Sequence, residues 1–408
     1  MILNTIKIVA VTFLTALSTN AMANHLSTKQ VVHEKKLTAV DYEKLDYVKQ
    51  NLNSLQFSLA YKNLLKTADK AMTEGSFSVM EKTQTPPSGS KHDYLSIGPY
   101  WWPDPTKADG LPWIRKDGKV NPLTREGSTD FETATKMFKN TSNLALAYFF
   151  TDDKKYANKA VELLKVWFLK PETKMNPNLN FAQGIPGMNS GRGIGIIEFG
   201  GITNIITAIE ILEINHAMDA KTSEGLRQWF ADYLQWLQTS ENGVFEKNTK
   251  NNHGTWYDVQ VSSILLFLDQ KEAAKQVLEA VKTERIASQI NAKGEQPHEL
   301  ERTKALSYSI MNLRGFTQLA YLGRKVGVDL WNYKSKDGAS IPQAYEFLKP
   351  YTKGEKKWNY KQIHDLDGVV EDSNELFMMA GSLFNVKEYT AIGAPKDGKS
   401  KSLFYFEK

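Results

Sequence analysis

Residues 255–268 read TWYDVQVSSILLFL, and apolar or aromatic side chains in this stretch fall at Tyr257, Val261, Ile264 and Leu268. Steps of three and four residues bring these side chains to one face of an α-helix. The same spacing recurs in residues 303–326, at Leu306, Ile310, Leu313 and Ala320. Each stretch is therefore predicted to be a helix that turns one face toward the protein core.

Most of the chain repeats this pattern. Long amphipathic stretches alternate with loops rich in Gly, Pro, Asn and Asp, and few segments show the alternating, β-branched pattern of strands. The predicted helices are 41–72, 131–150, 155–168, 192–217, 223–238, 255–268, 271–288, 303–326 and 373–384. Successive helices without strands between them pack as antiparallel hairpins. We therefore predict an all-α fold, an α/α toroid or barrel of helix hairpins.

The N-terminus has the zones of a secretory signal peptide. Lys7 precedes the apolar run 8–17, and Ala21-Met22-Ala23 supplies the small residues of a cleavage site. The apolar run is too short to span a membrane, and no later stretch reaches the ~18 uninterrupted apolar residues of a transmembrane helix. We expect a signal peptide at residues 1–23, a single domain at residues 24–408, and a periplasmic or secreted protein.

Composition excludes several classes of protein. The 408-residue chain has no cysteine, which excludes disulfides, thiolate metal sites and a cysteine nucleophile. Its formal net charge of +5 is mildly basic and favours a polyanionic partner. Nucleic acid is not expected, because the chain has no zinc-finger spacing, no ribonucleoprotein motif and no dense Lys/Arg stripe. The seven histidines form no His-Glu-x-x-His pattern, so a zinc site is not expected either. The oligomeric state is left open.

Two short clusters carry the groups needed to cleave a uronic acid polymer by β-elimination. In that reaction H5 leaves C5 and O4 departs from C4, and H5 becomes acidic only when the adjacent carboxylate is neutralised. Arg302 can hold a carboxylate with two parallel hydrogen bonds, and Asn252 can add an amide donor. His253 can act as general base or as a further carboxylate partner. Tyr308 can protonate O4, or remove H5 if it is ionised, so the acid and base roles remain exchangeable.

The spacing of these residues sets a geometric condition. Arg302 and Tyr308 lie six residues apart, about 120° away from a shared helix face. Both reach one substrate only if Arg302 lies at or before the start of the helix, with Thr303 as an acceptable N-cap. His253 similarly lies just ahead of the helix that begins near Trp256. Both clusters are therefore expected at helix N-termini, where the helix dipole favours bound carboxylates.

Four pieces of sequence carry a resemblance to a known family. They are DYLSIGPYWWPDP at 93–105, DGKVNP at 117–122, Asn251-Asn252-His253, and Glu301-Arg302-Thr303 with Tyr308. With these residues the chain resembles the bacterial alginate lyase superfamily over most of the mature protein, and within it looks closest to polysaccharide lyase family thirty-eight. One departure is the Arg-to-Tyr spacing, which differs slightly from that of the shorter polymannuronate lyases.

The resemblance implies an α/α barrel that cleaves an anionic uronic acid polysaccharide and needs no metal or organic cofactor. The implied substrate is mannuronate-containing alginate or a related polyuronate such as glucuronan. The resemblance also implies that Asn252, His253, Arg302 and Tyr308 match the family's neutralising amide, histidine, arginine and catalytic tyrosine.

Further substrate contacts are expected in and near the long irregular segments 84–130 and 171–195, which we place at the mouth of a cleft. Aromatic faces pack on sugar rings, and Asn or Arg side chains bind a neighbouring uronate. The predicted contacts are Tyr94, Tyr100, Trp101, Trp102, Asn189, Arg192 and Tyr257. For Trp101 and Trp102 the alternative is equally strong, because bulky aromatics beside prolines often pin a loop to the core.

Two other classes of protein fit parts of the sequence. A glycoside hydrolase on an α/α barrel would need two opposed carboxyl groups, drawn from Glu198, Glu299 and Glu301. A non-catalytic periplasmic glycan-binding protein could keep the aromatic cleft without a working acid and base.

Overall fold

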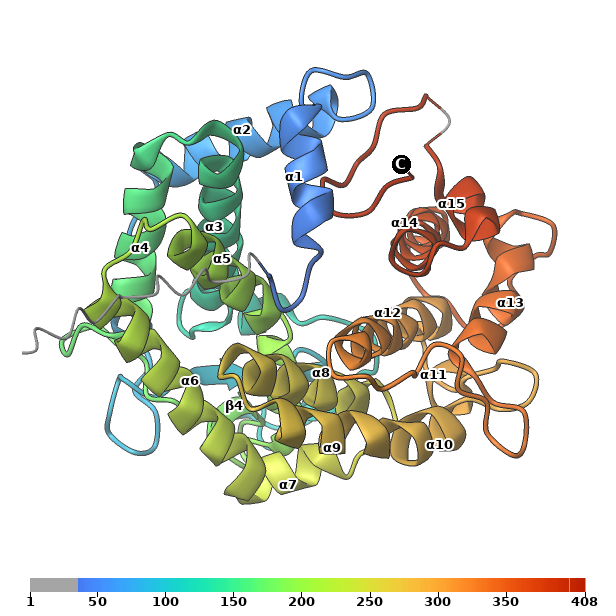
Figure 1. The fold of residues 1–408 in the computed structure, drawn as a ribbon. Coiled ribbons are helices and arrows are strands. Elements are labelled where there is room, and N and C mark those ends of the chain that lie inside the picture. Colours follow the sequence, from blue (N-terminus) through green and yellow to red (C-terminus); the bar gives the residue numbers. More distant parts are fainter. Residues whose placement is uncertain (1–35, 396, 408) are drawn as a thin grey trace, which may run out of the picture. The chain divides into compact units, whose positions relative to one another are not determined.

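A computed structural model describes residues 36–395 and 397–407 of the chain. The signal peptide expected at residues 1–23 lies outside these residues. Five helices form an inner ring in which each packs against the next: α3 (Phe131–Thr151), α5 (Ile202–Ile214), α8 (Asn252–Phe267), α12 (Ala305–Arg324) and α14 (Leu366–Phe384). Figure 1 shows these helices in chain order around the molecule.

A second set of helices covers the ring from outside. They are α2 (Ser58–Thr73), α4 (Lys154–Phe168), α6 (Ala220–Thr239), α9 (Lys271–Val281) and α13 (Ile341–Thr352). Helices α2, α4, α9 and α13 each contact an inner helix next to them in the sequence, as in the pairs α3·α4, α8·α9 and α13·α14, and α6 contacts the inner helix α8. The predicted all-α toroid of antiparallel helix hairpins is therefore confirmed.

The position of a helix in the toroid explains its composition. Inner helix α8 is buried along most of its length, because it has neighbours on both sides and an outer helix behind it. Outer helix α9 buries only Ala274, Leu278 and Val281, and its other faces are polar. Inner helix α8 is thus buried on nearly all sides, whereas outer helix α9 is amphipathic.

One helical stretch, Gly193–Ile214, is long and apolar enough to cross a membrane by composition. It comprises the 3-10 helix Gly193–Phe199 and α5, and 67% of its most apolar window is buried inside the structure. Helix α5 packs against α3 and α8. Its apolar composition is therefore that of a core helix in the inner ring.

Shorter elements complete the fold. They are α1 (Tyr42–Gln50), α7 (Glu241–Lys247), α10 (Ala287–Gln289), α11 (Pro297–Leu300), α15 (Lys387–Gly393), the 3-10 helices Val79–Glu81 and Pro122–Arg125, and the π-helix Lys282–Ile286. The C-terminal segment returns to α1, where the Phe406 ring contacts those of Tyr47 and Phe57. These contacts pack the two ends of the described chain together.

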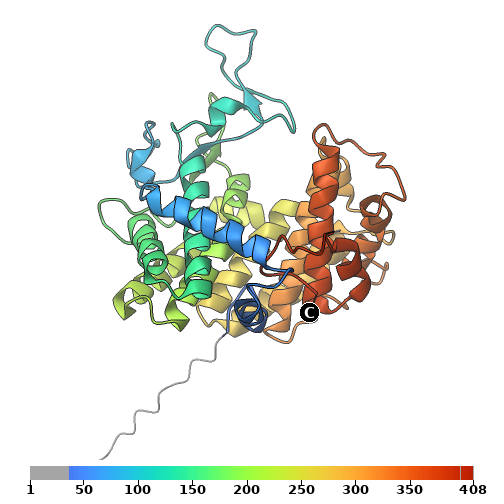
Figure 2. The ribbon, with the colours of Figure 1, turned by 90° about the horizontal axis from the view of Figure 1, so that it is seen from above.

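Two small sheets join the long irregular segments at one end of the helices. Strand β1 (Leu95–Ile97) pairs in parallel with β4 (Phe181–Gly184), and β2 (Trp101–Trp102) pairs antiparallel with β3 (Ile114–Arg115). Figure 2 shows the β2–β3 hairpin projecting beyond the helix ends. The segments 84–130 and 171–195 are thereby held to each other at that end.

Candidate active site

A cavity of about 790 Å³ lies where the β2–β3 hairpin meets the N-terminal ends of α8 and α12. Both long segments contribute to its lining, through Tyr100, Trp101 and Arg115 from one and Gln183 and Arg192 from the other. Residues 249–253, His298, Arg302, Tyr308 and Met311 contribute to the wall on the helical side. Its size falls within the usual range of ligand-binding pockets.

Arg302 and Tyr308 lie side by side in this cavity. Arg302 follows α11 and precedes the first residue of α12, and its Nη2 donates a hydrogen bond to the Tyr308 hydroxyl at 3.1 Å. Its guanidinium carbon is 4.2 Å from the centre of the Tyr308 ring. The residue that precedes α12 is Lys304, whereas the predicted cap Thr303 donates its hydroxyl to Asp117 at 2.9 Å. The expected N-cap is thus wrong, although Arg302 does lie before the helix.

Asp117, on the loop after β3, holds Arg302 in place. Its carboxylate accepts hydrogen bonds from Arg302 Nη2 at 2.8 Å and Nε at 3.3 Å, in addition to the Thr303 hydroxyl. Burial opposes the charge of Asp117, but these hydrogen bonds and the charge of Arg302 keep its pKa well below the usual value. Asp117 is therefore ionised and orients the guanidinium before any substrate binds.

Tyr308 is protonated in this environment. Burial raises the pKa of Tyr308 above its usual value, and the neighbouring Tyr100 adds to the shift while the charge of Arg302 offsets part of it. The Tyr100 and Tyr308 hydroxyls are 2.7 Å apart and share a hydrogen bond. Tyr308 thus offers a proton to a group bound in the cavity.

Asn252 and His253 occupy the first turn of α8. The Asn251 side chain caps this helix by accepting from the His253 backbone N–H at 3.2 Å. Asn252 donates both its backbone N–H and its side-chain amide to the buried Glu299, at 2.7 Å each. These bonds join the start of α8 to α11, the helix that leads into Arg302.

A buried carboxylate fixes the orientation of His253. Nδ1 of His253 lies 2.7 Å from Oε1 of Glu246, whose side chain is fully buried on α7. A carboxylate only accepts hydrogen bonds, so the proton on Nδ1 is donated to Glu246. The lone pair of the neutral ring is then on Nε2, which suits a general base.

The cavity is strongly basic. In the described part of the chain, five arginine or lysine side chains and one carboxyl group line it. The cations are Arg115, Arg125, Arg192, Lys250 and Arg302, and the carboxyl group is that of Glu198. Burial lowers the pKa of Arg192 to about 10, so this side chain remains charged at neutral pH. Burial raises the pKa of Glu198, which favours its neutral form. The site is therefore suited to a ligand that carries several negative charges.

The structure brings together most of the predicted site residues. Asn252, His253, Arg302, Tyr308, Tyr100, Trp101 and Arg192 all line the one cavity. Arg192 donates from Nε to the Gln183 carbonyl at 2.7 Å, and its guanidinium lies 5.7 Å from the Trp101 ring. This pair places a cation and an aromatic face on the same wall.

Four predicted substrate contacts lie elsewhere. Tyr94 and Tyr257 are only 1% and 3% exposed, and their hydroxyls donate to Glu198 and to the Leu237 carbonyl, so they belong to the core. Trp102 donates to the Lys119 carbonyl at 3.1 Å, which pins the hairpin loop. Asn189 is exposed and accepts from its neighbour Ile185. None of these four residues lines the cavity.

The sequence did not predict the supporting roles of three site residues, one of which, Glu299, was considered only as a carboxyl group of a hydrolase. Asp117, Glu246 and Glu299 orient Arg302, His253 and Asn252 respectively. Asp117 does lie within the DGKVNP stretch, which marks that loop. Glu246 has no comparable signal, since it lies on a separate short helix before the one that carries His253.

The fold and site together define an α/α-toroid protein with a basic cavity built for an anionic ligand. A model of the alginate lyase family matches residues 78–358. The chain therefore belongs to the alginate lyase family. A comparison with curated protein sequences gave no significant match.

Solved structures agree with this assignment. An alginate lyase from Bacteroides ovatus is 40% identical, with a TM-score of 0.87 over 91% of this chain and 100% of that one. Alginate lyase A1-III from Sphingomonas species A1 is 19% identical, with a TM-score of 0.58 over 93% of this chain and 98% of that one. A histidine-to-alanine variant of A1-III complexed with a tetrasaccharide is 18% identical, with a TM-score of 0.60 over the same shares. The two A1-III structures show the common fold.

Proposed function

We propose that this protein is a polysaccharide lyase that cleaves alginate by β-elimination. The observation that carries the proposal is the pairing of Arg302 with a protonated Tyr308 in a cavity that also holds His253. The excess of cations around these residues supports a polyuronate as the substrate. Family membership and the relative from Bacteroides ovatus support alginate within that class.

The first step of the proposed reaction is neutralisation of the uronate carboxylate. Arg302 has its guanidinium in the cavity and held by Asp117, and it binds the carboxylate of the sugar whose C5 reacts. Asn252 has one amide proton bound to Glu299 and offers the other to the developing enolate. Both groups lower the energy of the carbanion at C5.

The second step transfers two protons. His253 Nε2 removes H5, and the electrons of the C5–H bond form the C4=C5 double bond. The C4–O4 bond breaks, and Tyr308 protonates the departing O4. We assign these roles because Nδ1 of His253 is committed to Glu246 while Tyr308 carries its proton. Exchange with solvent then returns a proton from His253 to Tyr308.

Replacing Tyr308 tests the proposal directly. Tyr308→Phe removes the proton donor but keeps the ring, so turnover should fall by about 10²–10⁴-fold. Turnover is measured as ultraviolet absorbance of the 4,5-unsaturated product from alginate, and binding by calorimetry should persist. Tyr148→Phe is the matched control, because the Tyr148 hydroxyl bonds to the Asn215 carbonyl and does not line the cavity. Unchanged turnover in Tyr308→Phe would exclude this residue as the acid.

The division of the two proton transfers has its own test. His253→Ala should lose turnover as severely as Tyr308→Phe if His253 is the base. Activity that survives in His253→Ala but not in Tyr308→Phe would assign both proton transfers to Tyr308.

A hydrolytic reaction is disfavoured by the surroundings of the carboxyl groups. Glu299 is buried and accepts two hydrogen bonds from Asn252, and Glu301 is exposed and does not line the cavity. Glu198 accepts from Tyr94 and Ser96. New reducing ends without ultraviolet absorbance would nevertheless establish hydrolysis and overturn the lyase proposal.

We further propose mannuronate-rich alginate as the preferred substrate. Support comes from the sequence resemblance, which implies mannuronate-containing alginate or a related polyuronate such as glucuronan. Initial rates on purified polymannuronate, polyguluronate and glucuronan test the preference. A higher rate on either of the other two polymers would reject it without affecting the assignment as a lyase.

A further inference from the structure

A second cavity, of about 660 Å³, adjoins the candidate active site. The two share Thr135, Ile197, Glu198 and Met311 in their linings. The second cavity, here called the inner cavity, continues between the inner helices α3, α5, α8, α12 and α14. The inner cavity and the cavity around Tyr308 are thus neighbours that share part of their walls.

One face of α12 connects the two cavities. Tyr308, Met311, Arg314 and Gln318 follow helical steps of three and four residues, and all four are half-buried among otherwise buried neighbours. Tyr308 lines the first cavity, Arg314 and Gln318 line the inner cavity, and Met311 lines both. Six residues of helix rise separate Tyr308 from Arg314, about 9 Å along the axis. A short oligosaccharide can span this distance.

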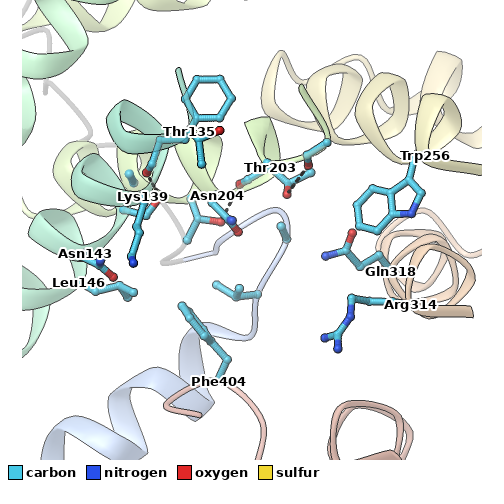
Figure 3. Close-up of a pocket in the computed structure, with 18 of the residues that line it drawn as sticks. Thr135, Lys139, Asn143, Leu146, Thr203, Asn204, Trp256, Arg314, Gln318 and Phe404 are labelled. Atoms are coloured by element: carbon cyan, nitrogen blue, oxygen red, sulfur yellow. Dashed lines mark hydrogen bonds between the residues drawn. The ribbon is translucent and has the colours of Figure 1, made fainter. Parts of the chain in front are cut away.

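Polar side chains project into the inner cavity from opposite sides. Figure 3 shows Lys139, Asn143 and Asn204 facing Arg314 and Gln318 across it, with Trp256 beside them. Within the part of the chain that the structure describes, neither Lys139 nor Arg314 has a hydrogen-bond or ion-pair partner. Among the described residues, Oε1 of Gln318 is also buried without a partner. Such groups are stabilised when a ligand supplies the missing partners.

The charges facing the inner cavity favour an anion. Among the described residues that line it, Glu198 is the one acidic residue, and burial raises the pKa of its carboxyl group. Lys139 and Arg314 therefore face little opposing charge. Trp256 contributes its indole ring, whose Nε1 donates a hydrogen bond to the Met311 carbonyl at 3.1 Å. Cations, free amides and an indole together match a sugar acid, which carries a carboxylate, hydroxyls and a flat apolar ring face.

We propose that the inner cavity is a binding subsite for uronate units that extend from the catalytic residues along the same polysaccharide chain. Arg314 and Lys139 bind carboxylates of these units, and Asn143, Asn204 and Gln318 bind their hydroxyls. This inference rests on the proposed function, because it takes the same polyuronate as its ligand.

The test measures how much a longer oligosaccharide improves binding, and compares this gain with and without the two cations. Saturated oligomannuronates of three and six units are titrated calorimetrically into Tyr308→Phe protein, and into the same protein with Lys139→Gln and Arg314→Gln added. The ratio of hexamer to trimer affinity should fall about ten-fold when both cations are removed, because charge-assisted hydrogen bonds to carboxylates are lost. Lys136→Gln is the matched control, since Lys136 lies on the same helix, pairs with Glu132 and does not line the cavity.

The outcomes separate this inference from the proposed function. An unchanged affinity ratio, or an equal loss for trimer and hexamer, overturns the inner subsite. Binding of inorganic phosphate that competes with neither oligosaccharide assigns the cations to a free anion and also overturns it. Absence of any unsaturated product from the unaltered protein rejects the proposed function, which the titration does not measure. Equal melting temperatures of the variants establish that the fold is intact.

Discussion

At the residue scale, Glu246 determines which nitrogen of His253 carries the proton. Glu246→Gln keeps the side-chain size but can present an amide N–H toward Nδ1, which favours the wrong tautomer. We expect kcat to fall at least about ten-fold with a smaller change in KM, because a general base contributes mainly to the chemical step. Glu241→Gln, on the exposed first turn of the same helix, is the matched control. Equal kcat values in the two variants would show that Glu246 does not position the histidine.

The sequence predicted the reacting side chains better than it predicted the residues that hold them in place. Arg302 and Tyr308 were recognisable because their six-residue spacing permits contact only at a helix start, and the structure has Arg302 just before α12. Glu246 and Asp117 were not recognised as supports, because each reaches its partner from a different element of the fold. The burial of Tyr257 agrees with its place on the core-facing side of the predicted helix and not with its prediction as a substrate contact, since its hydroxyl donates to the Leu237 carbonyl on α6.

At the scale of elements, Asp130 joins strand β1 to the inner ring. It precedes α3, and its carboxylate accepts from the Leu95 backbone N–H at 2.8 Å and from Lys82 Nζ at 2.9 Å. Both side chains of the Lys82 pair are fully buried. Asp130→Ala leaves the Lys82 charge without its partner, so the free energy of unfolding should fall by about 3–5 kcal/mol.

Urea denaturation at neutral pH measures this change. Asp153→Ala serves as the control, because Asp153 caps α4 from an exposed position and its loss should cost about 1 kcal/mol. A loss in Asp130→Ala no larger than in the control would mean that the buried pair contributes little to stability.

Long amphipathic patterns in the sequence predicted the helices. They did not predict where a helix is interrupted. The expected helix 41–72 is split into α1 and α2 around residues 51–57, where Asn51, Asn53 and Ser54 favour turns. The expected helix 192–217 begins as a 3-10 helix and passes through Gly200 and Gly201 before α5. Helix α13 was missed, although its Ser340 cap and Pro342 are standard signals of a helix start.

At the scale of the whole molecule, charge is distributed unevenly. The chain carries a formal net charge of only +5, yet five cations and one carboxyl group line the candidate active site. The toroid produces this concentration by bringing the β2–β3 hairpin, the segment 183–198 and the N-termini of α8 and α12 to one end. The modest overall charge therefore understates the attraction that a polyuronate meets in the cavity.

This concentration of charge predicts a strong salt dependence. Raising sodium chloride from about 0.05 M to about 0.5 M shortens the screening length to a few ångströms and should raise KM for alginate roughly ten-fold. The value of kcat should change by less than about two-fold, because the reacting groups remain in contact with bound substrate. Lys250→Gln, which removes a cation from the cavity lining, should flatten the salt dependence of KM, whereas Lys136→Gln should leave its slope unchanged. A KM that is independent of salt would show that binding relies on neutral contacts, and the cations of the cavity would then need another explanation.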